Sequence, residues 1–155
     1  MDYIIEVCHL SESFFEDYPS EKYPEIAYNK SGRPYSCLMI ETHDNYLICI
    51  PFRSHIKHKQ SYMFKNTQRS KVAESGLDFS KIILIDNPKY IISGAVVDND
   101  EYVEMMQNCS KIVSKTHTYI NTYVQHITKE KELNPRTFER KYKYTTLKYF
   151  HNLLF

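Results

Sequence analysis

Two apolar runs separated by a short polar connection constrain the fold of this chain more than any other feature. They cover residues 35–41 and 46–52, and both are rich in apolar and aromatic side chains. The four polar residues between them make a good turn, so the sequence predicts a β-hairpin. Apolar runs within residues 1–10, 81–86 and 90–97 also predict strands. Because no helix separates consecutive strands here, a small antiparallel barrel of about five strands fits better than a parallel sheet.

The hydrophobic period changes near Asp98. From there to Ile127, apolar side chains recur at spacings of three, four and seven residues, which predicts one amphipathic helix of roughly seven turns. Asp98 or Asp100 would cap this helix. Asn134-Pro135 predicts the cap and first turn of a second helix, whose apolar face would include the aromatic residues near the C-terminus.

Proline and glycine interrupt the early part of the chain. Ser11 predicts a helix N-cap, and Pro19 would end that helix after a short course. Residues 18–34 contain three prolines and one glycine, which is typical of a long loop. Residues 60–71 are polar and lack a period, so we expect an irregular segment there.

The length and composition favour a single folded domain. The 155 residues are enough for one substantial core, so residues 1–155 are treated as one domain. Charged residues make up 25% and nearly cancel, which argues against low-complexity disorder. We expect a cytoplasmic protein without membrane contact, because neither a signal peptide nor a long apolar span is evident. Four widely spaced cysteines without a CxxC pair fit reduced thiols.

The second hairpin run leads directly into a strongly basic segment. From residue 53 to residue 71 there are six basic side chains and no acidic ones. The basic residues are Arg53, Lys57, Lys59, Lys65, Arg69 and Lys71, and Ser54, His55 and His58 lie among them. Such clustered positive charge is the usual footprint of a polyanion partner. The sequence therefore predicts a working site where the strand ends.

The residue types in this segment argue against several chemistries. It offers no carboxylate or thiolate for a metal site, and the neighbouring Ser54 and His55 on an extended chain point apart instead of forming a triad. No glycine-rich phosphate loop is evident. The side chains do suit metal-free phosphate chemistry, in which the 2′-OH of RNA attacks the adjacent phosphorus. A solvated basic loop or a passive nucleic-acid surface fits the same composition equally well.

Short motifs around the hairpin resemble those of the toxins of type III toxin–antitoxin systems, the ToxN, AbiQ, TenpN and CptN proteins, with the CptN branch nearest. The motifs are Arg33-Pro34-Tyr35 before the first strand and Ile50-Pro51-Phe52-Arg53-Ser54-His55-Ile56-Lys57 after the turn. The layout is similar over nearly the whole chain, whereas only these motifs are specific. The chain departs from the family pattern with Arg53 in place of threonine and with an extra residue before Lys57.

The resemblance implies an α+β fold, a compact antiparallel SH3-like β-barrel of the Kid/MazF type with packed helices, two of them long and C-terminal. It implies a metal-independent endoribonuclease that needs no cofactor and leaves a 2′,3′-cyclic phosphate. The implied partners are cellular or phage RNA and a small repeated pseudoknot RNA antitoxin, which the toxin excises and which inhibits it in an alternating protein–RNA assembly. A role in phage defence would follow. The alternative is a non-catalytic nucleic-acid-binding protein that uses the same basic face.

The resemblance also implies roles for individual residues. The serine would hydrogen-bond the scissile phosphate, the arginines and the lysine would stabilise its charge, and one histidine would transfer protons. These catalytic candidates are Arg33, Arg53, Ser54, His55, Lys57 and His58. A second group would bind the RNA backbone, with a tyrosine stacking on a base. These RNA-binding candidates are Tyr28, Lys59, Lys65, Arg69 and Lys71.

Overall fold

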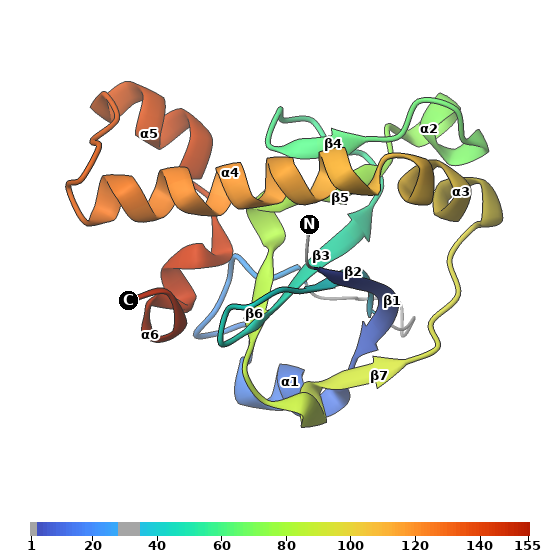
Figure 1. Cartoon of the computed structure of the whole chain (residues 1–155), viewed down its shortest axis with the longest axis horizontal. Helices are drawn as coiled ribbons and strands as arrows, with labels where there is room; N and C mark the ends of the chain where they lie inside the picture. The colour runs from blue at the N-terminus through green and yellow to red at the C-terminus, as the bar shows by residue number, and fades with distance from the viewer. Residues whose placement is uncertain (1–2, 28–34) are drawn as a thin grey trace.

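The computed structural model describes residues 3–27 and 35–155 and shows an α+β protein with an antiparallel sheet (Figure 1). The strands are β1 (Ile4–Leu10), β2 (Tyr35–Glu41), β3 (Leu47–Arg53), β4 (Ser61–Met63), β5 (Gly76–Asp78), β6 (Ile83–Ile85) and β7 (Ile91–Ser93). The α-helices are α1 (Glu12–Asp17), α2 (Gln68–Ala73), α3 (Asn99–Gln107), α4 (Cys109–Ile127), α5 (Pro135–Tyr142) and α6 (His151–Leu154). Three 3₁₀ turns are η1 (Phe79–Lys81), η2 (Pro88–Tyr90) and η3 (Thr146–Tyr149).

The predicted hairpin forms the centre of the sheet. β2 pairs with β3 from Cys37 opposite Pro51 to Glu41 opposite Leu47, and β1 lies on the other side of β2. Both hairpin strands are buried over most of their length, which explains their nearly continuous apolar character. The hairpin prediction is confirmed.

The sheet is open in the part of the chain that the structure describes, so the expected small antiparallel barrel is not confirmed. Its strand order is β4-β5-β3-β2-β1-β7, and β6 also pairs with β3. β4 and β7 therefore lie at opposite ends of that order. The strands β4, β5, β6 and β7 have three residues each, which gives the outer strands little length with which to wrap round and close the sheet.

β3 changes its outer neighbour along its length. Its first half pairs with β6, from Leu47 to Cys49, whereas Phe52 and Arg53 pair with β5. β5 and β6 thus pair one after the other with the same edge of β3, and η1 separates them. This turn lies close to the point where β3 delivers Arg53 to the surface.

The close approach of β4 to β5 requires a glycine. A Cβ added at Gly76 would lie 2.2 Å from the backbone oxygen of Tyr62, which no side chain can tolerate without moving the strand. Met63 is the register partner of Gly76, and Ser61 is the partner of Asp78. Gly76 therefore allows β4 and the loop before it to lie against the end of β5.

The C-terminal helices are shorter than expected. The predicted seven-turn helix is divided at Asn108, which leaves helical geometry with φ −121° and ψ 17° and donates its side-chain amide to the backbone oxygen of Glu104. The second predicted helix begins as expected, with the Asn134 side chain accepting from the backbone N–H of Arg136. It ends at Tyr142, and the rest of that segment forms η3 and α6. Tyr119 holds Thr145 at this break through a 2.9 Å hydroxyl hydrogen bond.

The segment expected to be irregular contains two short elements, β4 and α2. Thr67 caps α2 and accepts from the backbone N–H of Ser70, while the Ser70 hydroxyl accepts from Thr67 N–H. This reciprocal capping box stabilises a helix with no buried side chain, which explains why the apolar pattern did not reveal it.

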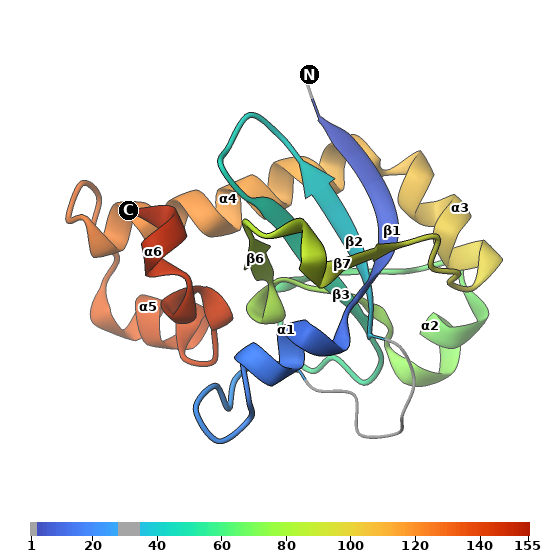
Figure 2. The same cartoon turned by 90° about the horizontal axis from the view of Figure 1, so that it is seen from below.

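One hydrophobic core joins the sheet to its helices. Figures 1 and 2 show α3 and α4 running along one side of the sheet, with α5 and α6 beside one end of α4 and with α1 next to the η2 turn. Buried side chains from β1, β2, β3, β6, α4 and η3 belong to one cluster. The assignment of residues 1–155 to one domain stays a prediction.

Candidate active site

Asp78 is the centre of a polar cluster at the end of β3. Its side chain is fully buried, although it carries a carboxylate. One oxygen accepts from the backbone N–H and the hydroxyl of Ser80, at 3.0 and 2.6 Å, and so caps η1. A buried carboxylate needs such partners, because an unpaired charge in the interior is costly.

Arg53 is anchored by this carboxylate. Its Nη1 donates to the second oxygen of Asp78 at 2.7 Å, while 40% of the arginine side chain stays exposed. Its register partner on β5 is Gly76, two residues before Asp78, so the two side chains lie on the same face of the sheet. The geometry fixes the position of a guanidinium that still reaches solvent, which is how proteins present arginine to phosphates.

The partners of Asp78 keep it ionised. Burial alone raises the pKa of this carboxyl, but the hydrogen bonds from His58 and Ser80, together with Arg53, outweigh burial and lower its pKa below the ordinary value. Arg53 therefore faces a permanent negative charge at neutral pH. This charge holds the arginine in one place.

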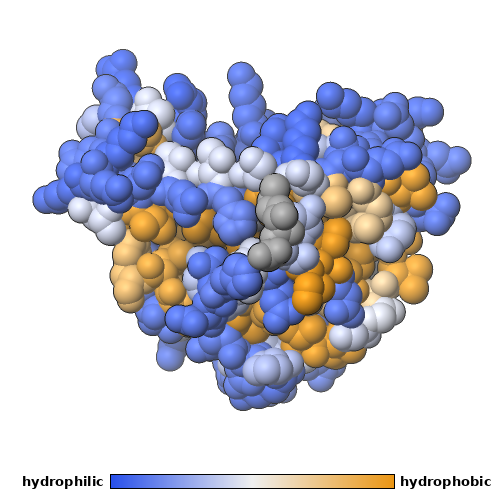
Figure 3. All heavy atoms as spheres, in the orientation of Figure 1, coloured by the Kyte–Doolittle hydropathy of each residue, from blue (hydrophilic) through white to orange (hydrophobic). Residues whose placement is uncertain are grey.

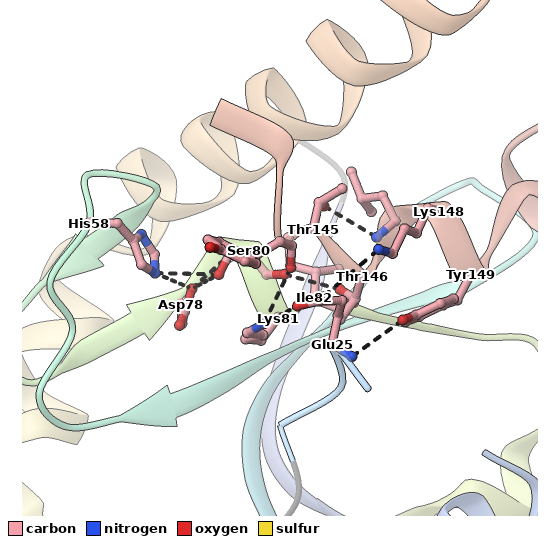
Figure 4. Close-up of polar contacts among 12 residues, drawn as sticks. Glu25, His58, Asp78, Ser80, Lys81, Ile82, Thr145, Thr146, Lys148 and Tyr149 are labelled. Carbon is pink, nitrogen blue, oxygen red and sulfur yellow. Dashed lines mark hydrogen bonds and ion pairs between the residues drawn. The ribbon is translucent and has the colours of Figure 1, made fainter. Parts of the chain in front are cut away.

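His58 has both ring nitrogens engaged inside the protein. Its Nδ1 accepts from the backbone N–H of Gln60 at 3.0 Å, and its Nε2 lies 3.1 Å from Asp78 and 3.3 Å from the Ser80 hydroxyl (Figure 4). An Nδ1 that accepts leaves the ring proton on Nε2, where it is directed at the carboxylate. His58 is therefore arranged to position Asp78 and the loop after β3.

Ser54 and His55 form the turn that leaves β3. His55 has a left-handed backbone with φ 59°, held by a hydrogen bond from its N–H to the oxygen of Ala73 and one from Ile56 N–H to the oxygen of Glu74. A histidine in this region is uncommon, and such strain concentrates at functional sites. His55 is exposed, and within the described residues its imidazole has no partner. It is thus free to meet a ligand beside Arg53.

The cations that follow are in different environments. Lys57 is 73% exposed and forms a 2.9 Å ion pair with Glu74. Arg69 on α2 contacts the acidic start of α3, at 2.9 Å from Asp98 and 3.9 Å from Glu101. Lys59, Lys65 and Lys71 are exposed and have no ion-pair partner in the described part of the chain. The basic segment is therefore partly neutralised by the protein itself.

The loop before α2 is fixed by a buried acid. Glu104 on α3 accepts from the backbone N–H groups of Lys65 and Asn66 at 2.8 to 3.1 Å. Asp100 accepts from the N–H of Gln68 at the start of α2. Together with the Arg69 pairs, these contacts attach the basic segment to α3.

Two predicted site residues, Arg33 and Tyr28, lie outside the described residues. The remaining catalytic candidates lie in the last residue of β3 and the turn after it, from Arg53 to His58. The RNA-binding candidates Lys65, Arg69 and Lys71 lie further along, before and within α2.

A second polar network lies behind Asp78 (Figure 4). Lys81, with 15% of its side chain exposed, lies 3.4 Å from Glu25 and donates to the backbone oxygen of Tyr144. Burial lowers the pKa of Lys81, and Glu25 and Asp78 partly restore it. Thr146 donates to the oxygens of Ser80 and Ile82 and joins η3 to this network. The network holds the η1 turn between the sheet and the C-terminal segment.

Asp78, Ser80 and Lys81 belong to the site, but the sequence did not reveal them. Each belongs to β5 or η1, and neither element was predicted. The one available signal was a charged residue between two apolar ones, because Asp78 stands between Leu77 and Phe79. A charge in an apolar run suggests a buried residue with dedicated partners.

Three thiols are the described residues that could together hold a metal ion. Cys8, Cys37 and Cys49 come from three adjacent strands, and their Sγ atoms lie within 4.8 Å of one another. All three are fully buried, and the Sγ atoms of Cys8 and Cys37 are 3.5 Å apart. Three soft thiolate ligands would suit copper(I), whereas a structural zinc site would need a fourth ligand.

Among the described residues, two cavities of different character lie outside the Asp78 cluster. One has a volume of about 270 Å³ between β1, the segment after β7 and α3, and its lining includes Ile5, Val7, Met105 and Met106. The other, of about 210 Å³, is polar and lies between β4, η1, α4 and α5. The polar cavity adjoins the candidate site, since its lining includes Lys59, next to His58, and Phe79, next to Asp78.

Among the described residues, no helix has the length and apolar character needed to span a bilayer. Searches against family models, curated proteins and solved structures found no match to this chain.

Proposed function

We propose that this protein is a metal-independent endoribonuclease that cleaves RNA by attack of the 2′-OH on the adjacent phosphorus. One observation carries the proposal: buried Asp78 fixes the half-exposed guanidinium of Arg53 beside the strained Ser54-His55 turn. An anchored cation beside an exposed imidazole and a hydroxyl supplies charge neutralisation, proton transfer and hydrogen bonding to a phosphodiester.

The contacts distinguish the two histidines. His58 is engaged through both ring nitrogens, whereas the imidazole of His55 is open to solvent. We therefore assign proton transfer to His55 and a positioning role to His58. Arg53 would stabilise the phosphate charge, Ser54 would donate to a phosphate oxygen, and Lys57 would release Glu74 and bind the same group.

The motif resemblance extends the proposal to the biological setting. A type III toxin acting on cellular or phage RNA in the cytoplasm, inhibited by a pseudoknot RNA, would fit these residues. The open sheet lends no support to a barrel of the Kid/MazF type, so the proposal rests on the site and its motifs.

A His55→Asn variant tests the assignment. Asparagine tolerates left-handed backbone but does not transfer protons at neutral pH, so folding should persist while cleavage of single-stranded RNA falls by about 10²–10⁴-fold. His43→Asn, in the turn before β3 at the other end of the strand, is the matched control and should retain wild-type cleavage. Thermal unfolding measured beside the cleavage rate separates lost chemistry from lost structure.

Equal activity of the His55→Asn and wild-type proteins would remove His55 from the mechanism. Wild-type protein that binds RNA tightly and leaves it intact would instead favour the rival class, a non-catalytic RNA-binding protein.

A further inference from the structure

The polar cavity between β4, η1, α4 and α5 gathers positive charge. Three lysines from three separate parts of the chain contribute to its lining: Lys59 before β4, Lys115 on α4 and Lys141 on α5. The hydroxyl-bearing residues Ser114, Thr118 and Thr122 also line it. Among the described residues that form its walls, none is acidic.

These three lysines differ from the cations near the site that the protein itself neutralises. Lys57, Lys81 and Arg69 each have a carboxylate within 4 Å. Within residues 3–27 and 35–155, the ammonium groups of the three lining lysines have neither an ion-pair nor a hydrogen-bond partner. Cations that converge on a concave surface without counter-charge create a positive potential that attracts anions.

The α4 contribution follows from the helix period. Lys115, Thr118 and Thr122 are spaced by three and four residues and share one face of the helix. The core side of α4 is separate and includes Ile112, Thr116 and Ile120. Figure 3 shows a largely polar surface over α4 and α5, whereas apolar surface gathers around α6. Lys115 and Thr118 are exposed, so this face of α4 is available to a ligand.

The cavity and the catalytic cluster share their framework. The backbone N–H of Phe79 donates to the oxygen of Gln60 at 3.0 Å, which joins the segment after Asp78 to the segment after His58. Phe79, Gln60 and Lys59 all line the cavity. The cavity is therefore held in place by the segments that directly follow His58 and Asp78 in the chain.

We propose that this cavity holds a backbone phosphate of the bound RNA, a few nucleotides away from the bond that is cleaved. This inference rests on the proposed function, because it takes RNA as the occupant. Lysine ammonium groups and hydroxyls would donate to the phosphate oxygens without reading the base. The cavity sets a minimum length for good substrates.

The test compares a long substrate with one that cannot reach the cavity. The ratio of kcat/KM for a single-stranded RNA to that for a mixture of dinucleoside monophosphates is measured for wild type and for the double variant Lys115→Ala, Lys141→Ala. We expect this ratio to fall about tenfold or more, as for the loss of charged hydrogen bonds. Lys143→Ala removes an exposed charge near the cavity outside its lining and should keep the wild-type ratio.

An unchanged ratio in the double variant would overturn the proposal, whether the two kcat/KM values stay at the wild-type level or fall by the same factor. If the wild type cleaves neither substrate, the proposed function fails while the cavity is still tested by binding. Affinity for non-cleavable 2′-O-methyl RNA, measured by fluorescence anisotropy, should then fall in the double variant and not in Lys143→Ala. The RNA assignment would be contradicted if millimolar inorganic phosphate competed with the RNA while the double variant lost no RNA affinity. That result would identify a site for free phosphate.

Discussion

At the scale of single residues, one buried carboxylate determines what the end of β3 can do. Asp78 caps η1, accepts from Arg53 and lies next to His58, so three elements depend on it. The sequence predicted Arg53, Ser54 and His55 as site residues because they follow an apolar strand in a basic segment. It did not reveal Asp78, because β5 has only three residues and no period to detect.

The environment of Asp78 predicts a specific pH dependence of stability. Its partners lower the folded-state pKa, so its stabilising contribution is complete above the unfolded pKa of about 3.9 and is lost as the pH falls through the folded value. Asp78→Asn should reduce the free energy of unfolding by about 2–3 kcal/mol at pH 7, which is the usual range for a hydrogen bond to a charged group. Chemical denaturation of both proteins at a series of pH values from 7 to 3 measures this difference.

The difference between the two proteins should shrink as the pH falls below about 4. A difference that stays constant down to pH 3 would show that the Asp78 charge does not stabilise the fold.

At the scale of elements, α3 determines how much of the basic segment is available to the proposed RNA ligand. Glu104 and Asp100 bind the backbone at the start of α2, and Asp98 and Glu101 lie against Arg69. The composition of residues 53–71 alone gave its six basic residues equal weight as candidate contacts to a polyanion. The acidic partners come from a helix about 30 residues further along, and charge counting in one segment does not include them.

Arg69 and Lys71 should therefore respond differently to charge removal. Lys71→Ala should flatten the dependence of RNA affinity on salt by about 0.7 in the log–log slope, the value for one phosphate contact on a single strand. Arg69→Ala should change the slope less, since Asp98 already neutralises that guanidinium. Anisotropy titrations with 2′-O-methyl RNA at several salt concentrations give the slopes, and a larger effect of Arg69 would mean that its ion pairs open on binding.

At the scale of the whole molecule, local patterns predicted the fold better than they predicted its closure. The β2–β3 hairpin and the start of α5 were correct, because apolar runs, turns and an Asn-Pro cap are local signals. The break at Asn108 was missed because the apolar period continues across it. The expected barrel is not confirmed, because the described sheet is open and closure depends on short outer strands that carry little sequence signal.

The central claim is that this chain cleaves RNA through the 2′-OH without a metal. The most direct measurement incubates purified protein with single-stranded RNA in EDTA and identifies the new 3′ ends by mass spectrometry. Cleavage should persist, the new ends should carry 2′,3′-cyclic phosphate, and 2′-O-methyl RNA of the same sequence should stay intact. Intact RNA, or products that end in a 3′-hydroxyl, would contradict the claim.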